Sequence, residues 1–590
     1  MTSPRLTARS VRLGALVLVV ALLAACAQVP TGGPVVEAKE RGQAVQTQIQ
    51  YFNPKGPQPG QAPADVVTGF LVAMTATPLT IRTAQKFLSR QARSQWQPQR
   101  VITYNDRSAP RGAENVVVRL LGADQVGAGG QWQGAVPVSA RRLVFPMIRE
   151  NNEWRIDAAP DALIVPRTFY DEQYTDDAQI YFFDPTGRIL VPEPVHVPQG
   201  SQLASSLVRV LVRGPGDSLG GVVRTFVPPR LTVNVSVPVS KDGVALVTLK
   251  GPDPGPLNRR TTRLVVAQLA WTLRQDPSIT SFRVTMGGRP LADATGSQSF
   301  RVPSGVVGAP QTPSSRYDPA AYLASPQYYA LRDGRLVSGR IDHLTTVDGP
   351  FGRTAQGIGP FAVSLDGNEV AGVTPRSLVT GPVLGPQDTN EVLQGSGLLR
   401  PAWDFADRLW DVQLGPSGAG VVYLAHGRRH LVRVPGITGK DVRRFLVSRD
   451  GSRLVAVLRG PAADRIVVSR LRYAGAKVVG TRARPIPWLS GGTTRVRDIG
   501  WTSPTTIAVL DQLSRSQAEV RILNIDGSTP PEQAPPILVN GRASGLVSSP
   551  NQTPYAVLPG GITDISGDGS QAFPNPQIPT GRLRHITYTG

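Results

Sequence analysis

The sequence contains a single cysteine, Cys26, among 590 residues. A chain with one thiol can form no internal disulfide bond, so its folded regions must be stabilised by apolar cores alone. Lysine and histidine are also scarce, with seven lysines among the 63 basic residues and five histidines in all. Aromatic residues make up only 6% of the chain, which gives no sign of the stacking platforms typical of sugar-binding proteins.

Sequence motifs for the commonest enzyme chemistries are absent as well. The chain has no G-x-S-x-G nucleophile elbow and no Gly-Lys-Ser/Thr loop to hold phosphates. The sequence therefore predicts no catalytic residue, no cofactor and no metal ligand, and favours a protein that is not an enzyme. A pair of catalytic carboxylates stays open as an alternative, because acidic residues are common and need no local motif.

Two short patterns resemble metal sites but lack decisive ligands. His426 and His430 have the i, i+4 spacing of helical zinc ligands, but Gly427 places them in a β-turn-β pattern, where they share no helix face. Residues 564–569 (DISGDG) match half of a calcium loop, whose twelfth position is Asn575 instead of the bidentate glutamate. We interpret the first pattern as a hairpin and the second as a solvated loop.

The N-terminus has the organisation of a secretory leader. Arginines at positions 5, 9 and 12 precede an apolar run from Leu13 to Leu23, which is too short to span a bilayer comfortably. The run ends in Leu-Ala-Ala-Cys, which resembles the bacterial lipobox, so we predict that residues 1–25 are a lipoprotein signal peptide and that Cys26 carries S-diacylglycerol and N-acyl groups. Two or three acyl chains anchor a protein stably, whereas one is marginal. An ordinary signal peptide with an incidental cysteine is the alternative.

The segment after Cys26 predicts a flexible tether, because residues 26–62 are rich in Gly, Pro and Gln.

The net charge of +21 suggests a nucleic-acid partner, but the arginines are scattered, no recognition helix is present and the leader exports the chain. We predict no nucleic-acid partner. The charge reflects either G·C-rich codons or attraction to anionic lipid or an anionic envelope polymer.

The first folded region is predicted to span residues 63–165. Apolar residues recur at helical spacing from Val67, and Thr80 is expected to cap a second helix that ends before Pro98. Alternating strand patterns follow at residues 116–121, 143–147 and 154–156, with a turn at 151–152. Helices followed by antiparallel strands predict an α+β layer, for which we expect a curved sheet wrapped on helices, as in NTF2-like domains.

The second region, residues 166–303, alternates strands and helices. Strands are predicted at 179–183 and 282–286, a hairpin at 233–249, and helices at 203–211 and 266–273. This order predicts one sheet with helices on one face. The stretches IYFFDPTG, LVRVLVRGP, VSKDGVALVTL and VTMGGRPL, in this order, resemble the GerM-type (GerMN) domain of bacterial envelope and sporulation proteins. The resemblance implies an α+β binding module. We predict that a linker follows at residues 304–315.

The third region, residues 316–590, contains repeats. Residues 361–373 and 445–457 share the pattern F-x-V-S-x-D-G and lie 84 residues apart, with weaker copies between and after them. A period of about 40 to 50 residues without amphipathic helices predicts an all-β propeller of about six blades, with five or seven as alternatives. The Trp-Asp pairs at 403–404 and 410–411 resemble a WD repeat. Its Gly-His partner is missing, so we expect these tryptophans to be core residues.

The whole chain resembles the LpqB-type actinobacterial lipoproteins. The most specific matches are LAAC at 23–26, GFLVAMT at 69–75, VLVRGP at 210–215 and the two F-x-V-S-x-D-G copies. The resemblance implies a lipid anchor on the outer face of the cytoplasmic membrane, attached through Cys26. It also implies an accessory role beside the sensor histidine kinase of the Mtr two-component system, whose extracellular domain would be the partner and whose output bears on cell-wall homeostasis and division.

Two other function classes stay open from the residues alone. One is an envelope glycan-binding protein or a propeller-type enzyme acting on wall polysaccharide, which would need a cleft with two carboxylates and aromatic walls. The other is a scaffold without a signalling role.

Overall fold

The structure is a computed structural model of the 590-residue chain. It describes residues 51–175, 177–304, 311–320, 325–474, 477–488, 495–528, 535–550, 552–567 and 577–590. Residues 1–52 and 53–590 are separate units, and the three folded regions belong to the second unit. Cys26, the predicted signal peptide and most of the predicted tether lie outside the described residues. Within the described part of the chain, no helix has the length and apolar character needed to cross a bilayer.

The N-terminal region begins with three helices: α2 (Pro63–Ala73), α3 (Arg82–Gln85) and α4 (Arg90–Gln95). The first confirms the predicted helix from Val67. The prediction of one helix capped by Thr80 is wrong, because the chain breaks between α3 and α4, where Leu88 forms a bridge with Ile156. The Oγ of Ser89 then accepts a hydrogen bond from the N–H of Ala92 (3.1 Å) and caps α4. A buried apolar contact thus outweighs the continuous helical spacing.

The strands of this region form two four-stranded sheets, ordered β5-β4-β1-β8 and β2-β3-β6-β7. Their bounds are β1 Arg100–Tyr104, β2 Asp106–Arg107, β3 Asn115–Leu121, β4 Asp124–Val126, β5 Trp132–Ala135, β6 Arg142–Glu150, β7 Glu153–Ile156 and β8 Ala162–Pro166. Only Asn105 separates β1 from β2, so one run of chain belongs to both sheets. Asn151 and Asn152 have positive φ (51° and 66°) and make the predicted turn. The α+β prediction is confirmed; similarity to NTF2 stays a prediction.

The second region contains two sheets and a short strand pair, so the prediction of one sheet is wrong. Its strands are β9 Tyr174–Thr175, β10 Gln179–Phe183, β11 Leu190–Pro194, β12 Val197–Pro198, β13 Thr232–Val233, β14 Val244–Lys250, β15 Ser281–Met286, β16 Arg289–Pro290 and β17 Phe300–Arg301. The strand β10 pairs with β11, and β12 with β9, whereas β13-β14-β15-β16, with β17 beside β15, form the larger sheet. The sequence did not reveal β11 (LVPEP), because two prolines and a glutamate interrupt its apolar pattern although all five residues are buried.

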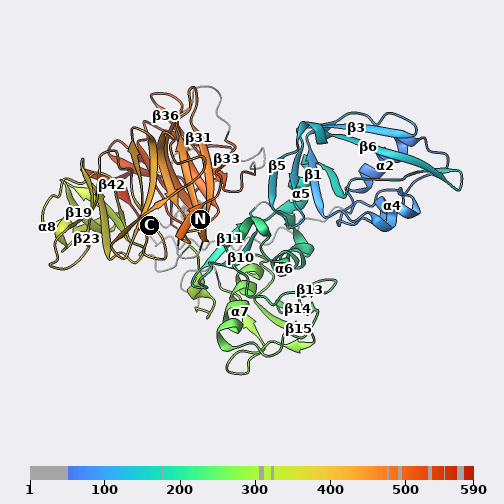
Figure 1. Cartoon of the computed structure of the whole chain (residues 1–590), viewed down its shortest axis with the longest axis horizontal. Helices are drawn as coiled ribbons and strands as arrows, with labels where there is room; N and C mark the ends of the chain where they lie inside the picture. The colour runs from blue at the N-terminus through green and yellow to red at the C-terminus, as the bar shows by residue number, and fades with distance from the viewer. Residues whose placement is uncertain are drawn as a thin grey trace, which may run out of the picture. The chain divides into compact units, whose positions relative to one another are not determined.

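The helices of the second region are α5 (Arg167–Gln173), α6 (Leu203–Arg213) and α7 (Arg259–Leu273). The side chain of Asn258 caps α7 by accepting a hydrogen bond from the N–H of Thr261 (2.9 Å). Helix α7 packs on β10, and α6 contacts both β10 and β13. The strands β14 and β15 run parallel, joined through α7, as a parallel connection requires. Figure 1 shows α6 and α7 in the same part of the molecule as the strands β13, β14 and β15.

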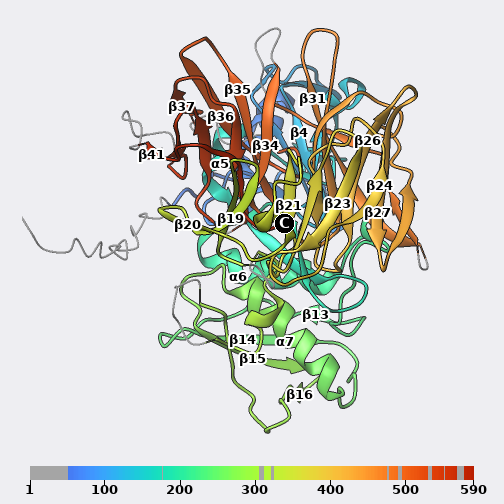
Figure 2. The same ribbon diagram turned by 90° about the vertical axis from the view of Figure 1, so that its left-hand side faces the viewer.

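The described residues of the third region form six sheets, which confirms a propeller of about six blades. Their strand orders are β20-β19-β18-β42, β21 to β24, β25 to β28, β29 to β32 with β33 beside β31, β34 to β37 and β38 to β41. The blades surround the last residues of the chain (Figure 2), and β42, from the far end of the region, pairs with β18. The strand bounds are β18 Tyr328–Arg332, β19 Arg335–Arg340, β20 His343–Thr346, β21 Phe361–Val363, β22 Glu369–Val373, β23 Ser377–Pro382, β24 Asn390–Gln394, β25 Ala402–Trp403, β26 Leu409–Gly415, β27 Gly418–Ala425, β28 Arg428–Val432, β29 Val442–Val447, β30 Arg453–Leu458, β31 Arg465–Ala474, β32 Lys477–Gly480, β33 Arg484–Ile486, β34 Val496–Ser503, β35 Thr506–Gln512, β36 Gln517–Asn524, β37 Ile537–Asn540, β38 Gly545–Val547, β39 Tyr555–Leu558, β40 Gly561–Asp564, β41 Ile578–Pro579 and β42 Leu583–Thr587; a single helical turn, α8 (Pro350–Arg353), follows β20.

The repeated F-x-V-S-x-D-G pattern makes the tight turn between the first two strands of a blade. In the second copy, the Ser448 hydroxyl donates to Asp450 Oδ1 (2.6 Å) and accepts from the N–H of Arg453 (3.0 Å). Gly451 follows with φ of 65°, a backbone conformation that favours glycine. A Cβ at this position would also lie 2.4 Å from the guanidinium of Arg408. The motif is therefore explained by turn geometry and close packing.

Candidate functional site

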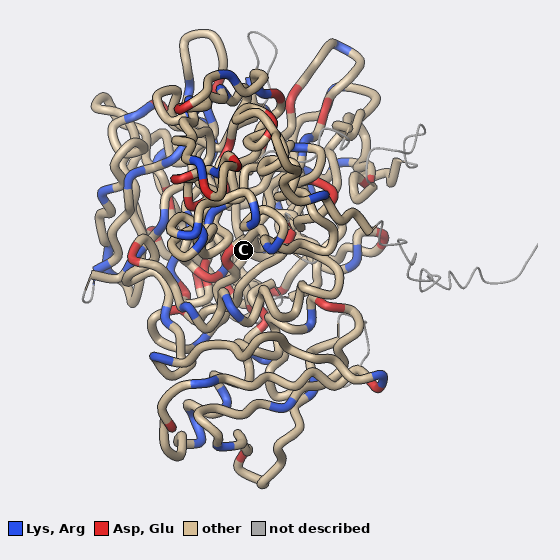
Figure 3. Tube along the Cα trace, turned by 90° about the vertical axis from the view of Figure 1, so that its right-hand side faces the viewer, with Lys and Arg blue, Asp and Glu red and all other residues tan. Residues whose placement is uncertain are grey.

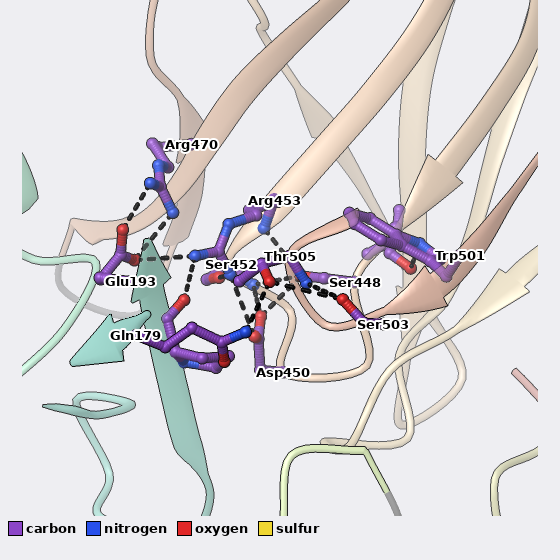
Figure 4. Close-up of polar contacts among 12 residues, drawn as sticks. Gln179, Glu193, Ser448, Asp450, Ser452, Arg453, Arg470, Trp501, Ser503 and Thr505 are labelled. Carbon is purple, nitrogen blue, oxygen red and sulfur yellow. Dashed lines mark hydrogen bonds and ion pairs between the residues drawn. The ribbon is translucent and has the colours of Figure 1, made fainter. Parts of the chain in front are cut away.

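The polar residues that most clearly form a site lie where the second region meets the propeller. We call this contact the junction. It consists of the β10–β11 hairpin with the segment that follows it, Gln179 to His196, and the propeller residues that they touch. Figure 4 shows its central contacts.

A buried carboxylate is the centre of the junction. Glu193 of β11 is 5% exposed, and its Oε1 accepts hydrogen bonds from Arg453 (3.1 Å) and Arg470 (2.8 Å) of two neighbouring propeller strands. Arg453 is fully buried, and its guanidinium also donates to the carbonyl oxygen of Pro192 and pairs with Asp450 (3.3 Å). Two guanidinium groups thus meet two carboxylates, so the cluster is neutral. A neutral cluster of paired charges can be buried where a single charge cannot, although Nε of Arg453 has no hydrogen-bond partner among the described residues.

Further contacts surround this cluster. The amide of Gln179 donates to the Thr505 hydroxyl (2.8 Å). Ile189 packs with Leu365 and Phe405 in a small apolar cluster. Together with Arg453 and Arg470, polar and apolar groups from four blades therefore hold the hairpin of the second region.

His196 extends the junction to the N-terminal region. Its Nε2 lies 3.0 Å from Asp526 Oδ2 of the propeller, and its ring packs against Trp132, with ring centroids 5.3 Å apart. The backbone N–H of His196 donates to the carbonyl oxygen of Gly130 (2.7 Å). Burial raises the pKa of Asp526, but the hydrogen bond and charge of His196, together with hydrogen bonds from Ser528, outweigh this and leave the pKa below its ordinary value. One histidine thus contacts both neighbouring regions.

A cavity of about 360 Å³ lies beside the junction. Residues of both regions line it: Tyr181, Trp271 and Arg274 belong to the second region, and Ser503 belongs to the propeller. The guanidinium of Arg274 lies over the Trp271 ring at 4.4 Å. Two carboxylates, Asp177 and Asp318, also line the cavity. Acidic and aromatic groups in one hollow are the features that the glycan alternative requires.

The structure does not bring the described residues of either metal-like pattern together as ligands. His426 lies in the turn between β27 and β28, whereas His430 lies in β28 and stacks on Tyr423 at 4.6 Å. This confirms the predicted hairpin. Of the loop at 564–569, the structure describes Asp564, whose Oδ1 accepts from the N–H of Ser566 (2.7 Å); residues 568–576 lie outside the described part. Among described residues, no three His, Cys, Asp or Glu side chains gather as a metal site would need.

The two Trp-Asp pairs lie inside the propeller, as predicted. Trp403 is 5% exposed and Trp410 fully buried. Asp404 accepts hydrogen bonds from the Trp410 indole (2.7 Å) and from Arg408 Nε (2.7 Å). These residues connect strands within a blade, so they are part of its internal packing.

Asp411 differs from Asp404, because it is fully buried and neither of its carboxyl oxygens has a hydrogen-bond partner within the described part of the chain. Burial raises the pKa of Asp411 from 3.8 to about 8. The N–H groups of Leu399 and Val412 are close enough to lower the pKa slightly, but they do not meet the distance and angle of a hydrogen bond. The group is therefore protonated in the folded protein at pH 7.

Replacing Asp411 with asparagine is expected to stabilise the protein at neutral pH only. Between about pH 4 and about pH 8, the unfolded chain releases this proton and the folded chain keeps it. The free energy of unfolding of the wild type therefore falls by up to about 4 kcal/mol by pH 7. A buried amide without partners costs about 1–3 kcal/mol. We therefore expect urea unfolding to give Asp411→Asn a free energy of unfolding about 1–3 kcal/mol above that of the wild type at pH 7.5, and no difference at pH 4.5. The exposed Asp342→Asn serves as control; an equal gain at both pH values would contradict this account.

Family models match most of the described chain. The model described as "Lipoprotein LpqB, N-terminal domain" matches residues 56–171, and the model described as "Lipoprotein LpqB beta-propeller domain" matches residues 334–558. The chain belongs to the LpqB lipoprotein family. A third model, described as "Sporulation and spore germination", matches residues 179–292, between the other two. The region boundaries predicted from the sequence stay predictions.

Relatives in this family extend over nearly the whole chain. "Lipoprotein LpqB" of Thermobifida fusca (strain YX) is 29% identical, covering 86% of this chain and 88% of its own. "Lipoprotein LpqB" of Mycobacterium paratuberculosis is 27% identical, covering 95% and 96%. Among solved structures, TolB from Acinetobacter baumannii aligns with 61% of this chain and 99% of its own at 14% identity, with a TM-score of 0.30. The relatives and the family models, without the TolB match, show that the chain is a member of a lipoprotein family with a propeller domain.

The junction residues were missed from the sequence. Glu193 lies in the unrecognised strand β11, and His196 was considered only as one of five scattered histidines. Arg453 occupies the position of the repeat that Glu369 occupies in the other copy, where the side chain is exposed. No periodic signal distinguishes these polar residues from ordinary surface residues.

Proposed function

We propose that the protein is a lipid-anchored, non-enzymatic accessory of a two-component sensor histidine kinase, of the Mtr type. It is held through Cys26 on the outer face of the cytoplasmic membrane and binds the extracellular domain of the kinase. Its action would affect cell-wall homeostasis and division. Membership of the LpqB lipoprotein family is the observation that carries this proposal.

The junction supports the proposal physically. An accessory protein alters a kinase only if it binds two kinase states with different affinities. A rigid body can discriminate between such states better than loosely linked modules, because less of the binding free energy is lost in ordering its parts. The buried pairs of Glu193 with Arg453 and Arg470 hold the second region on the propeller and so provide such a body.

The charge distribution is consistent with a role at the envelope. Lys and Arg residues occur throughout the described part of the trace and are interspersed with acidic residues (Figure 3). Such a surface favours diffuse attraction to anionic lipid or envelope polymer over recognition of one phosphate backbone. We propose no nucleic-acid partner.

Site-specific photo-crosslinking in intact cells tests the kinase role. Exposed apolar side chains suitable for the probe are Leu384 and Leu431 in the propeller and Val235 in the second region, with Val138 in the N-terminal region for comparison. We expect mass spectrometry to identify a sensor histidine kinase at one or more of the first three positions. Cells that lack the protein should show a kinase phosphorylation level that differs from that of cells that contain it. Capture of wall polymer alone, with unchanged phosphorylation, would contradict the proposal.

A second candidate function is favoured by the 360 Å³ cavity, where Asp177, Asp318, Tyr181 and Trp271 face one hollow. Such a site suits a short glycan of the envelope. A further probe in place of Ser503, which lines this cavity, lets the crosslinking experiment separate the two functions, because a glycan binder would capture polysaccharide there and no kinase.

A further inference from the structure

A smaller cavity, of about 60 Å³, lies at the centre of the propeller. Its walls come from the innermost strands of several blades and the residues next to them, at 400–403, 445–447, 449, 499–501, 546, 548–550 and 587–590. A water molecule needs about 10–15 Å³ of such volume, so the cavity holds a few waters or one small ion. Ligands the size of a sugar or nucleotide need about 300 Å³ or more and are excluded.

Arg449 brings a buried positive charge to this cavity. It is 6% exposed, and its guanidinium donates to the carbonyl oxygens of Ala320 and Thr589 and to the Ser549 hydroxyl. All three partners are neutral, and Nε has no partner within the described part of the chain. Burial lowers the pKa of Arg449 to about 10, against the weaker opposing effect of the Asp318 charge, and this leaves the group charged at pH 7.

Arg400 brings a second charge to the same cavity. Its guanidinium donates to the Thr587 hydroxyl, and among described residues it forms no ion pair. The nearby Asp498 is engaged with Arg444 (3.3 Å) and with the N–H of Leu546 (2.9 Å). In addition, the buried Ser548 hydroxyl oxygen has no hydrogen-bond partner among the residues that the structure describes. Two cations and an unused hydroxyl thus line one hollow.

Turn geometry does not explain Arg449. In the other copy of the F-x-V-S-x-D-G pattern, Leu365 occupies the equivalent position and is also buried. Burying an unpaired charge is costly, whereas a bound anion would turn that cost into charge-assisted hydrogen bonds. We propose that the central cavity of the propeller binds one small oxyanion, a phosphate or a carboxylate group, through Arg400, Arg449 and Ser548. The inference is independent of the proposed kinase role.

Calorimetric titration of the full-length protein in detergent tests the site. Sodium phosphate is the first ligand and sodium acetate the second, both at constant ionic strength maintained with chloride. We expect saturable binding of one anion, weakened about tenfold to a hundredfold in Arg400→Gln, because a hydrogen bond to a charged group has about that effect. Arg449→Leu should weaken binding similarly, and since Leu365 is accepted in the equivalent turn, this variant should fold.

The controls distinguish a built site from surface attraction. Arg443→Gln, whose guanidinium is partly exposed and paired with Asp441, should bind as the wild type does, and Arg400→Lys should retain part of the affinity. Stronger binding of phosphate or of acetate identifies which oxyanion the site prefers, and either result supports it. Absence of saturable binding of both ligands, or equal binding by the wild type and both loss variants, would overturn the inference and leave only water in the cavity.

Discussion

Replacing Cys26 with serine is expected to transfer the protein from the detergent phase to the aqueous phase in a phase-separation assay. The serine hydroxyl cannot form the thioether, so two or three acyl chains are lost together. A single acyl chain already gives only marginal membrane binding. The leader cannot replace the anchor, because its apolar run from Leu13 to Leu23 is about half the length of a membrane-spanning helix.

Mass spectrometry of the N-terminal peptide provides the direct readout. In the wild type we expect a peptide that begins at Cys26 and carries both the diacylglyceryl and the N-acyl group. Ala27→Ser, one position further along, is the matched control and should remain acylated. A Cys26→Ser protein that stays in the detergent phase, together with an unmodified wild-type thiol, would show that the anchor was assigned wrongly.

Replacing Arg453 with methionine is expected to destabilise the protein by about 3–5 kcal/mol. Methionine fills a similar volume, but it leaves the carboxylates of Glu193 and Asp450 buried without this partner. Arg470 still compensates Glu193 in part, from a partly exposed position. Denaturant unfolding followed by tryptophan fluorescence and by circular dichroism measures the change. We expect the contact between the propeller and the second region to be lost first.

Two further variants make this prediction sharp. Arg340→Met removes an exposed guanidinium paired with Asp342 and should change stability by less than about 1 kcal/mol. Adding Glu193→Gln to Arg453→Met should recover part of the loss, because it removes one of the two buried charges. If Arg453→Met unfolds like Arg340→Met, the buried cluster does not hold the junction.

The fold followed from the sequence wherever a pattern is local. Alternation in β14 and β15, helical spacing in α2 and α7 and the repeated turn of the propeller each reflect which side of one element is buried. The prediction failed where a distant contact decided the outcome. The bridge between Leu88 and Ile156 interrupts a helical pattern, and β11 is a strand because it lies between β10 and the propeller.

The candidate site was harder to predict than the fold. The motif that ends at Cys26 is contiguous, so the sequence alone can predict a lipobox there; this stays a prediction, because Cys26 lies outside the described residues. Glu193 and Arg453 are 260 residues apart, and each stands alone in an apolar strand. Charge pairing of this kind leaves no periodic trace in one sequence, so only their proximity in the folded chain identifies them.

The sequence by itself determined the order of three folded regions and the repeat of the propeller, because both rest on neighbouring residues and on short-period burial; the leader with its single thiol stays a prediction of the sequence. Only the tertiary structure decided that β10 and β11 form their own sheet, that the second region is joined to the propeller through Glu193, Arg453 and Arg470, and that Arg400 and Arg449 face one cavity. The physical reason is that a charge can be buried only when its partner lies within a few ångströms. Tertiary folding, and not the local sequence pattern, brings such partners together.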